Sequence, residues 1–140
     1  MSYARRMVDS YPGALDVDAG LLATTIDALS DCFQACVADA DADLREQHTA
    51  DLIKCIRLCL DCADICSATV GITSRQTERD SNVTRLLLEA CAAACKVCAD
   101  ECEKHAPYHA HCRVCLEACR RCEQACRQLL AANEIRGTDE

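Results

Sequence analysis

Cysteine recurs along this chain at intervals of three and four residues, which is the spacing of one face of an α-helix. Fifteen of the 140 residues are cysteine, and they fall into four groups along the sequence. The groups are Cys32 and Cys36; Cys55, Cys59, Cys62 and Cys66; Cys91, Cys95, Cys98 and Cys102; and Cys112, Cys115, Cys119, Cys122 and Cys126. Because alternating gaps of three and four keep side chains on one side of a helix, the spacing predicts four helices that each present a row of thiols.

The amphipathic pattern around these thiols predicts an all-α fold in one domain. Charged residues such as Lys96 and Arg120 occupy positions that face away from the thiols, and no segment has a strong strand pattern. Four such helices with short connections favour an antiparallel up-down-up-down four-helix bundle with a Cys-lined core. We expect an irregular lead-in over residues 1–17, the bundle over 18–135 and a tail over 136–140.

Capping and breaking residues predict the limits of the helices. An aspartate can accept a hydrogen bond from the first turn of a helix, a glycine often ends one, and a proline ends one helix or opens the next. The expected helices run from Asp16 or Asp18 to about Ala40, from within 41–44 to Gly71, from an open start within 73–82 to the residue before Pro107, and from Pro107 onward.

Antiparallel topology separates a polar end of the predicted bundle from an apolar one. The connection between the first two helices and the connection between the last two lie at the same end. All four histidines and one acid gather there: His48, Asp51, His105, His109 and His111. At the other end the same helix faces carry Leu21, Leu22, Leu29, Val70, Leu87, Leu88, Leu129 and Leu130. The sequence therefore predicts a polar mouth at one end and an apolar closure at the other.

Composition limits the compartment and the partners. Aromatic residues make up only 3% of the chain, so cysteine, alanine and leucine must fill the core. The formal net charge of −8 disfavours nucleic acid and anionic membrane surfaces as partners. Asp9, Pro12, Asp16 and Asp18 interrupt the stretch where a secretion signal needs an apolar run, and no later stretch reaches about 18 uncharged apolar residues. We therefore expect a cytoplasmic protein with reduced thiols and no membrane partner.

Rows of reduced thiols predict a soft metal, because thiolates favour Cu(I), Zn(II) and iron–sulfur clusters over hard cations. Structural zinc uses separate quartets on non-helical turns, and iron–sulfur sequences place tight cysteine runs on loops; neither pattern occurs here. Cu(I) accepts low coordination numbers and bridging sulfur, and it leaves the site uncharged when it replaces a thiol proton. We predict that several Cu(I) ions bind along the helix axis, and no group of residues argues for catalysis.

The candidate metal ligands are the fifteen cysteines and the four histidines. His48 and His105 project onto the cysteine faces of their predicted helices, and His111 flanks its face. The place of His109 depends on where the last helix begins. Asp51 is expected to be a solvated acid in the first turn of its helix, with metal binding as the alternative.

Taken together, the cysteine and histidine motifs resemble those of the bacterial copper storage proteins of the cytosolic type, over residues 18–133. The motifs are CFQAC at 32–36, CIRLCLDCADIC at 55–66, CAAACKVCADEC at 91–102, HAPYHAH at 105–111 and CRVCLEACRRCEQAC at 112–126. The resemblance implies a four-helix bundle that assembles as a homotetramer and fills its core with Cu(I). It carries over all fifteen cysteines as ligands, and His105, His109 and His111 as residues of the open end. A copper chaperone or a copper enzyme is the expected exchange partner.

Two other functions fit parts of the pattern. A metallothionein-like protein would use the same thiols to buffer zinc or soft metals in general. A thiol redox protein would instead need an exposed CxxC motif with a low thiol pKa at the start of a helix. Cys112 and Cys115 come nearest to that arrangement.

Overall fold

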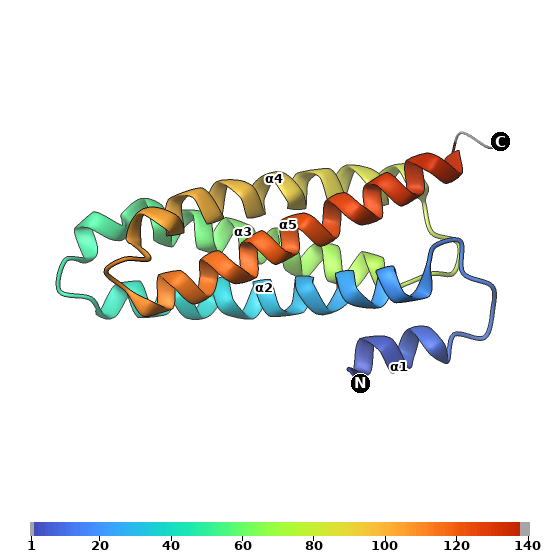
Figure 1. Ribbon diagram of the computed structural model, residues 1–140, viewed down its shortest axis with the longest axis horizontal. Helices are drawn as coiled ribbons and strands as arrows, with labels where there is room; N and C mark the ends of the chain where they lie inside the picture. The colour runs from blue at the N-terminus through green and yellow to red at the C-terminus, as the bar shows by residue number, and fades with distance from the viewer. Residues whose placement is uncertain (1, 138–140) are drawn as a thin grey trace.

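The computed structural model describes residues 2–137, and all of its regular structure is helical. The elements are α1 (Tyr3–Asp9), α2 (Ala19–Arg45), a single 3-10 turn η1 (Thr49–Leu52), α3 (Ile53–Thr73), α4 (Ser81–His105) and α5 (Ala110–Gly137). No strand occurs between residues 2 and 137, which confirms the predicted all-α class. Figure 1 shows α2, α3, α4 and α5 lying side by side, with the short α1 along α2.

The four long helices surround one core. Helix α2 packs against α3 and α5, and α4 packs against the same two neighbours. Consecutive long helices run in opposite directions in Figure 1, so the α2–α3 and α4–α5 connections lie at one end of the molecule, on the left of that view. We call this the histidine end, because all four histidines lie on or beside these two connections.

The α2–α3 boundary differs from its prediction. Helix α2 begins after Asp18, whose carboxylate accepts a hydrogen bond from the backbone N–H of Leu21 as expected. It does not end near Ala40 but continues to Arg45, and the predicted start of the next helix within 41–44 is therefore wrong. The extra turn of α2 packs against the rest of the protein through its inward face, where the side chain of Asp43 is fully buried.

The α4–α5 boundary is partly as predicted. Helix α4 begins after the capping residue Asp80 and ends at His105, before Pro107. Pro107 does not open the last helix, which starts at Ala110. The N–H groups of residues 108 and 109 both donate to the carbonyl of His105, and this turn displaces the start of α5 by three residues.

Both termini are more helical than predicted. Residues 3–9 form α1 instead of an irregular lead-in, because the Ser2 hydroxyl caps the helix and Val8 is buried against the core. At the other terminus α5 continues through residues 136 and 137, which were expected to belong to the tail. The rest of that expected tail, residues 138–140, lies outside the described residues.

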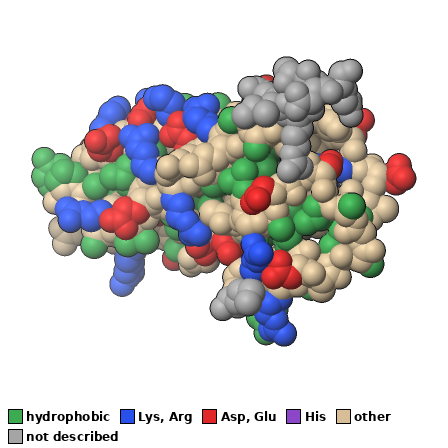
Figure 2. Space-filling view, turned by 45° about the vertical axis from the view of Figure 1, so that its right-hand side comes forward, with side chains coloured by type: hydrophobic (Ala, Val, Ile, Leu, Met, Phe, Trp, Pro, Cys, Tyr) green, Lys and Arg blue, Asp and Glu red, His purple; other side chains and the backbone are tan. Residues whose placement is uncertain are grey.

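The core has a thiol part and an apolar part. All fifteen cysteine side chains are fully buried and belong to one continuous cluster with the apolar core residues. At the end opposite the histidines, which we call the leucine end, the fully buried side chains are Leu22, Leu29, Leu88 and Leu129. Figure 2 turns this end toward the viewer, and no histidine is visible on the face drawn there.

Four buried threonines accompany these leucines, and each has its hydroxyl group satisfied inside its own helix. The hydroxyls of Thr25, Thr69, Thr73 and Thr84 each donate to the carbonyl four residues earlier. Because these polar atoms need no water or ion, the leucine end remains effectively apolar.

Helix α2 is the one helix between residues 2 and 137 that has the length and mean hydropathy of a membrane span, with a mean of 1.2 over its most apolar stretch. Its apolar face packs against α1, α3 and α5. The core helix of a protein that never enters a membrane meets the same criterion.

Candidate metal centre

The thiols of the four long helices form one connected array. Sulfur atoms of neighbouring helices approach to 3.7 Å between Cys36 and Cys119 and to 3.8 Å between Cys62 and Cys95. Other sulfur–sulfur contacts of 3.7–4.0 Å continue the array in both directions. They join Cys66 to Cys91, Cys32 to Cys95, and Cys98 to Cys59. Helical spacing within each segment and packing between the helices therefore bring the rows of thiols together between the four long helices.

The array does not divide into separate four-thiol sites. Sets of four thiols lie within 4.8 Å of one another, as a tetrahedral ion requires, but neighbouring sets share members. Cys32, Cys36 and Cys119 each belong to two such sets. A shared thiol must bridge two ions if both sets are filled, so the geometry suits clusters of a metal that accepts bridging sulfur.

Hydrogen bonding between neighbouring sulfur atoms lowers the pKa of some of these thiols, such as Cys32, and raises the pKa of others. Hydrogen bonds with Cys115 and Cys119, together with burial, raise the pKa of the Cys36 thiol. Hydrogen bonds with Cys122 and Cys91 and burial do the same for the pKa of Cys126 at the far end of the array. A metal ion that binds through a protonated thiol displaces its proton, which makes the affinity dependent on pH.

A buried carboxylate caps the array at the histidine end. The side chain of Asp39 is only 1% exposed, and one of its oxygens lies 3.4 Å from the Cys59 sulfur and 3.7 Å from those of Cys55 and Cys102. These four side chains also meet the distance requirement for a common ion. Asp39 was not among the predicted ligands, although it follows Cys36 by three residues and so shares its helical face.

A second buried carboxylate, Asp43, lies one turn further along α2. It accepts a hydrogen bond of 3.5 Å from the Cys112 thiol through Oδ1, while its Oδ2 atom is buried without a partner among the described residues. Burial raises the pKa of Asp43 to about 8, and hydrogen bonding to Cys55 and the charge of Asp39 add to this shift. The unpartnered oxygen points to a further ligand or proton at this position.

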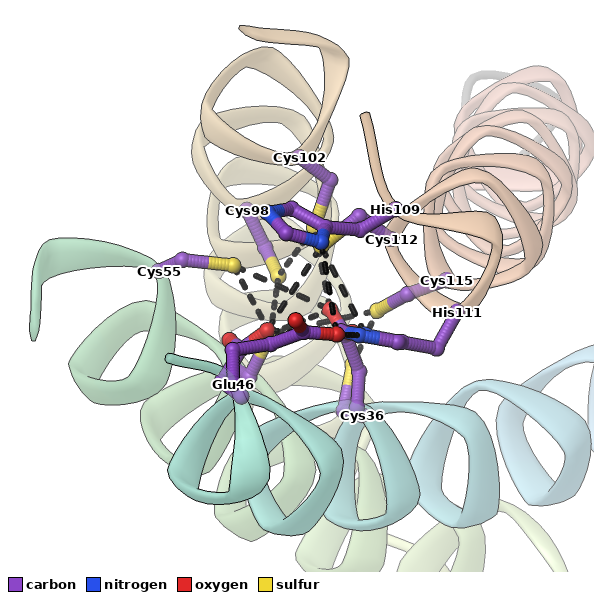
Figure 3. Close-up of polar contacts among 12 residues, drawn as sticks. Cys36, Glu46, Cys55, Cys98, Cys102, His109, His111, Cys112 and Cys115 are labelled. Atoms are coloured by element: carbon purple, nitrogen blue, oxygen red, sulfur yellow. Dashed lines mark hydrogen bonds and ion pairs between the residues drawn. The ribbon is translucent and has the colours of Figure 1, made fainter. Parts of the chain in front are cut away.

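His111 connects the buried carboxylates to the surface. Its Nδ1 atom lies 2.6 Å from Asp39 Oδ1 and its Nε2 atom 2.9 Å from Glu46 Oε1. Burial alone lowers the pKa of His111, but the hydrogen bonds to Asp39 and Glu46 and the charge of Asp43 outweigh it and raise that pKa. Figure 3 shows the His111 side chain reaching toward Glu46 across the end of the thiol array.

His109 lies beside His111 on the same side of the opening. The two rings stack with their centroids 5.4 Å apart, and His109 Nδ1 is 3.3 Å from Glu46 Oε1. Glu46 is the C-cap residue of α2 and was also missed from the sequence, because α2 was expected to end before it. The three side chains are each between 24% and 34% exposed, so they remain open to solvent.

The other two predicted histidines are placed differently. His105 Nε2 lies 2.9 Å from Glu101, a carboxylate that is 6% exposed and also faces Lys104 and Lys54. His48 is exposed at the start of η1, and its ring takes part in none of the hydrogen bonds or ion pairs found within residues 2–133. The structure therefore brings His109 and His111 together with acids near the thiols, and it leaves His48 in solvent.

Comparison with known proteins identifies the family to which this arrangement belongs. A family model described as copper storage protein matches residues 19–131, which include all fifteen cysteines and all four histidines. The chain belongs to the copper storage protein family.

Solved structures of copper storage proteins are similar to this chain in structure as well as in sequence. Streptomyces lividans Ccsp, loaded with 10 copper equivalents, is 52% identical with a TM-score of 0.90, over 92% of this chain and 98% of that one. The Cu(I)-bound protein BsCsp3 is 36% identical with a TM-score of 0.66, over 76% of this chain and 94% of that one. The uncharacterized cysteine-rich protein YhjQ of Bacillus subtilis is 37% identical over 76% of this chain and 93% of its own length.

Proposed function

We propose that this copper storage protein binds many Cu(I) ions per chain in the cytoplasm and acts as a reservoir rather than as an enzyme. One observation carries the proposal: fifteen buried thiols form a single array in which neighbouring four-thiol sets share sulfur atoms. Cu(I) tolerates such bridging, and its single charge balances the thiol proton that it replaces. The copper carried by Ccsp and by Cu(I)-bound BsCsp3 supports the choice of metal.

The proposed fold is an antiparallel up-down-up-down four-helix bundle of α2, α3, α4 and α5. Packing of each long helix against two neighbours and the alternating helix directions in Figure 1 support it. We propose all fifteen cysteines as ligands, with His105, His109 and His111 at the open end. His48 stays a predicted metal ligand, although the exposure of its side chain to solvent does not favour metal binding.

The capacity of the array tests the proposal. The reduced, metal-free protein is titrated anaerobically with Cu(I), and native mass spectrometry counts the ions held by each chain. Uptake of many ions, with release of roughly one proton per thiol engaged, is the expected result. Saturation at one or two ions would contradict a storage function.

Zinc is the second candidate metal, because each four-thiol set also fits a tetrahedral ion. A competition experiment separates the two metals: zinc-loaded protein is exposed to Cu(I) that is buffered by a chelator, and the released zinc is measured. We expect Cu(I) to displace zinc from the thiols. Retention of zinc against Cu(I) would favour a zinc or general metal buffer.

A thiol redox function has less support. It requires an exposed and reactive thiol, whereas Cys112 and Cys115 are both fully buried. Disulfide reductase turnover that is lost in a Cys112→Ser variant would revive it.

The histidines are proposed to act on the rate of metal transfer rather than on capacity. Replacement of His48, His105, His109 and His111 together by alanine should slow the entry or removal of Cu(I) while most of the capacity remains, because the capacity resides in the thiols. Stopped-flow mixing with a chromophoric Cu(I) chelator measures the rate, and native mass spectrometry measures the capacity. A large loss of capacity would contradict this division.

A homotetramer is proposed on the family resemblance alone. Light scattering coupled to size-exclusion chromatography measures the mass of the assembly, and a mass close to that of one 15.3 kDa chain would contradict it.

A further inference from the structure

Helix α4 carries a row of apolar side chains on the side that faces away from the core. The row, which we call the α4 stripe, has gaps of three and four residues, and all of its members are exposed: Val83, Leu86, Ala90, Ala93 and Val97. From its first residue to its last it extends about 21 Å, at about 1.5 Å per residue. The outward face of a helix that borders solvent normally carries charged and polar residues, so an uninterrupted apolar row there indicates a contact surface.

No other element within residues 2–137 covers the α4 stripe. Helix α4 packs against α3 and α5, and Figure 1 shows it along the edge of the bundle that lies away from α1. About half of each larger side chain is exposed, with 51% for Val83, 50% for Leu86 and 48% for Val97. Apolar residues at this heptad spacing are typical of a helix that packs lengthwise against another helix.

Four charged residues follow one edge of the stripe, and their signs alternate. In order along α4 they are Arg85, Glu89, Lys96 and Asp100. Within the chain Arg85 pairs with Glu89 at 3.1 Å, and Lys96 pairs with Asp100 at 2.8 Å. The same order read in reverse has the opposite sign at every position. A second copy of α4 that runs antiparallel to the first therefore presents the complementary charges.

We infer that the α4 stripe pairs with the α4 stripe of a second copy of this chain, antiparallel and about a two-fold axis. In this register Leu86 lies opposite Val97 of the second copy, and Ala90 lies opposite Ala93 of the second copy. The alanines at the centre let the two helices approach closely, and the larger side chains fill the space toward each end. The same surface is used by both copies, as a two-fold contact requires.

The same register also matches the charges. Glu89 faces Lys96 of the second copy, Arg85 faces Asp100 of the second copy, and the two-fold axis repeats both pairs. Exposed ion pairs contribute little free energy, so burial of the stripe supplies the affinity and the charges select the direction of pairing. A parallel pairing in register would place each charge against its own kind.

This inference adds an interface to the homotetramer proposed above, and it rests on that proposal only for the size of the natural assembly. A closed tetramer built on two-fold axes needs two different kinds of contact, and the α4 stripe supplies one of them. Loss of the α4 contact therefore halves the assembly instead of dispersing it into single chains.

A charge placed in the stripe tests the contact. Val97→Glu puts a carboxylate against Leu86 of the second copy, and the mass measured by light scattering after size-exclusion chromatography should fall to half that of the natural chain. Val114→Glu is the matched control, because it makes the same change at a valine of α5 that is 61% exposed, and it should leave the mass unchanged. Both variants should keep the circular dichroism spectrum and the Cu(I) capacity of the natural chain, since neither removes a buried group.

Charge reversal separates pairing between copies from pairing within one helix. Glu89→Lys and Lys96→Glu should each raise the dissociation constant about fivefold or more in analytical ultracentrifugation, because each places like charges opposite one another. The double variant restores opposite charges between the copies, although it breaks both ion pairs within α4. Recovery of association in the double variant supports the pairing. A double variant that associates more weakly than either single variant would overturn it.

The size of the natural chain distinguishes this inference from the proposed homotetramer. A natural tetramer whose mass is unchanged by Val97→Glu overturns the α4 contact and leaves the homotetramer standing. A natural dimer that Val97→Glu converts to single chains supports the α4 contact and contradicts the homotetramer. A natural chain with the mass of one 15.3 kDa chain overturns both. Copper storage is decided separately, by the Cu(I) titration.

Discussion

The inward faces of the four long helices carry apolar side chains at one end of this molecule and ionisable side chains at the other. At the leucine end the inward faces carry aliphatic side chains and threonines whose hydroxyls are satisfied within their own helices. At the histidine end the inward face of α2 carries two buried carboxylates, one of them with an oxygen that has no partner among the described residues, and α5 carries a histidine that reaches the surface. Burial of apolar groups stabilises the fold, whereas burial of carboxylates costs free energy unless a proton or metal compensates.

This difference predicts that stability and metal exchange depend on opposite ends of the molecule. The leucine end supplies folding free energy that offsets the cost of the polar end, and the thiol array lies between them. We therefore expect substitutions at the leucine end to change the free energy of unfolding without changing the copper capacity. Substitutions at the histidine end should change how stability depends on pH and how the protein binds metal.

The largest effect should come from the leucine end. Leu129→Ala removes a fully buried side chain and should lower the free energy of unfolding by about 3 kcal/mol, through lost burial and the cavity that remains. Urea unfolding of the reduced, metal-free protein measures this change. Leu86→Ala, at a position that is 50% exposed, is the matched control and should cost less than about 0.5 kcal/mol.

Copper capacity provides the decisive readout for the same variant. Cu(I) titration of Leu129→Ala should reach the capacity of the natural chain, because no thiol is removed. A capacity that falls with stability would show that the two ends are not independent.

A smaller effect should appear as a pH dependence at the histidine end. Burial raises the pKa of Asp43 from its ordinary value of 3.8 to about 8 in the fold. Between these values the folded protein holds a proton that the unfolded chain has released, so its free energy of unfolding falls as the pH rises. This single group contributes a slope of up to about 1.4 kcal/mol per pH unit. The raised pKa of His111 adds to the fall, because the protonated form is the one that the fold stabilises.

Asp43→Asn removes the contribution of that carboxyl group. Urea unfolding of metal-free protein at pH 5 and pH 8 should show a shallower loss of stability in this variant than in the natural chain. Asp64→Asn, an exposed position on α3, serves as the control and should keep the original slope. An unchanged slope in Asp43→Asn would mean that the buried carboxyl group is ionised throughout.

The smallest effect should come from the segment that covers the leucine end. Arg79, in the α3–α4 connection, donates to Asp16 at 2.6 Å, and the partner carboxylate is 68% exposed. Arg79→Met keeps most of the apolar stem but removes this ion pair, so the free energy of unfolding should fall by less than about 1 kcal/mol. Unfolding at low and at high salt checks the assignment, since the difference between variant and natural chain should shrink as salt screens the pair. A difference that grows with salt would rule out the ion pair as its cause.

Much of the fold could be predicted because cysteine marks the inward face of every long helix. The helical period of residues such as Cys91, Cys95 and Cys98 predicts burial on one side, and all three are fully buried. The capping aspartate Asp18 and the break before Pro107 were also readable, since capping and proline geometry are local properties.

The acids of the histidine end could not be predicted in the same way. Asp39 and Asp43 share the helical face of Cys36, but aspartate in a helix is normally solvated, and local pattern alone does not show that it is buried. Glu46 reaches His111 only because α2 continues past residue 40 and α5 begins at Ala110, which brings the ends of two helices together. Each of these contacts depends on where a helix begins or ends, and the sequence predicts those limits only to within about one turn.

The sequence by itself determined that four helices each carry an inward row of thiols, because the period of the backbone decides which side chains share a face. Only the tertiary structure decided which thiols share an ion-sized site, and that Asp39, Glu46 and two histidines meet at one end. The reason is that such sites join residues from different helices, and their distances depend on how far each helix extends and on its rotation and position along the bundle axis.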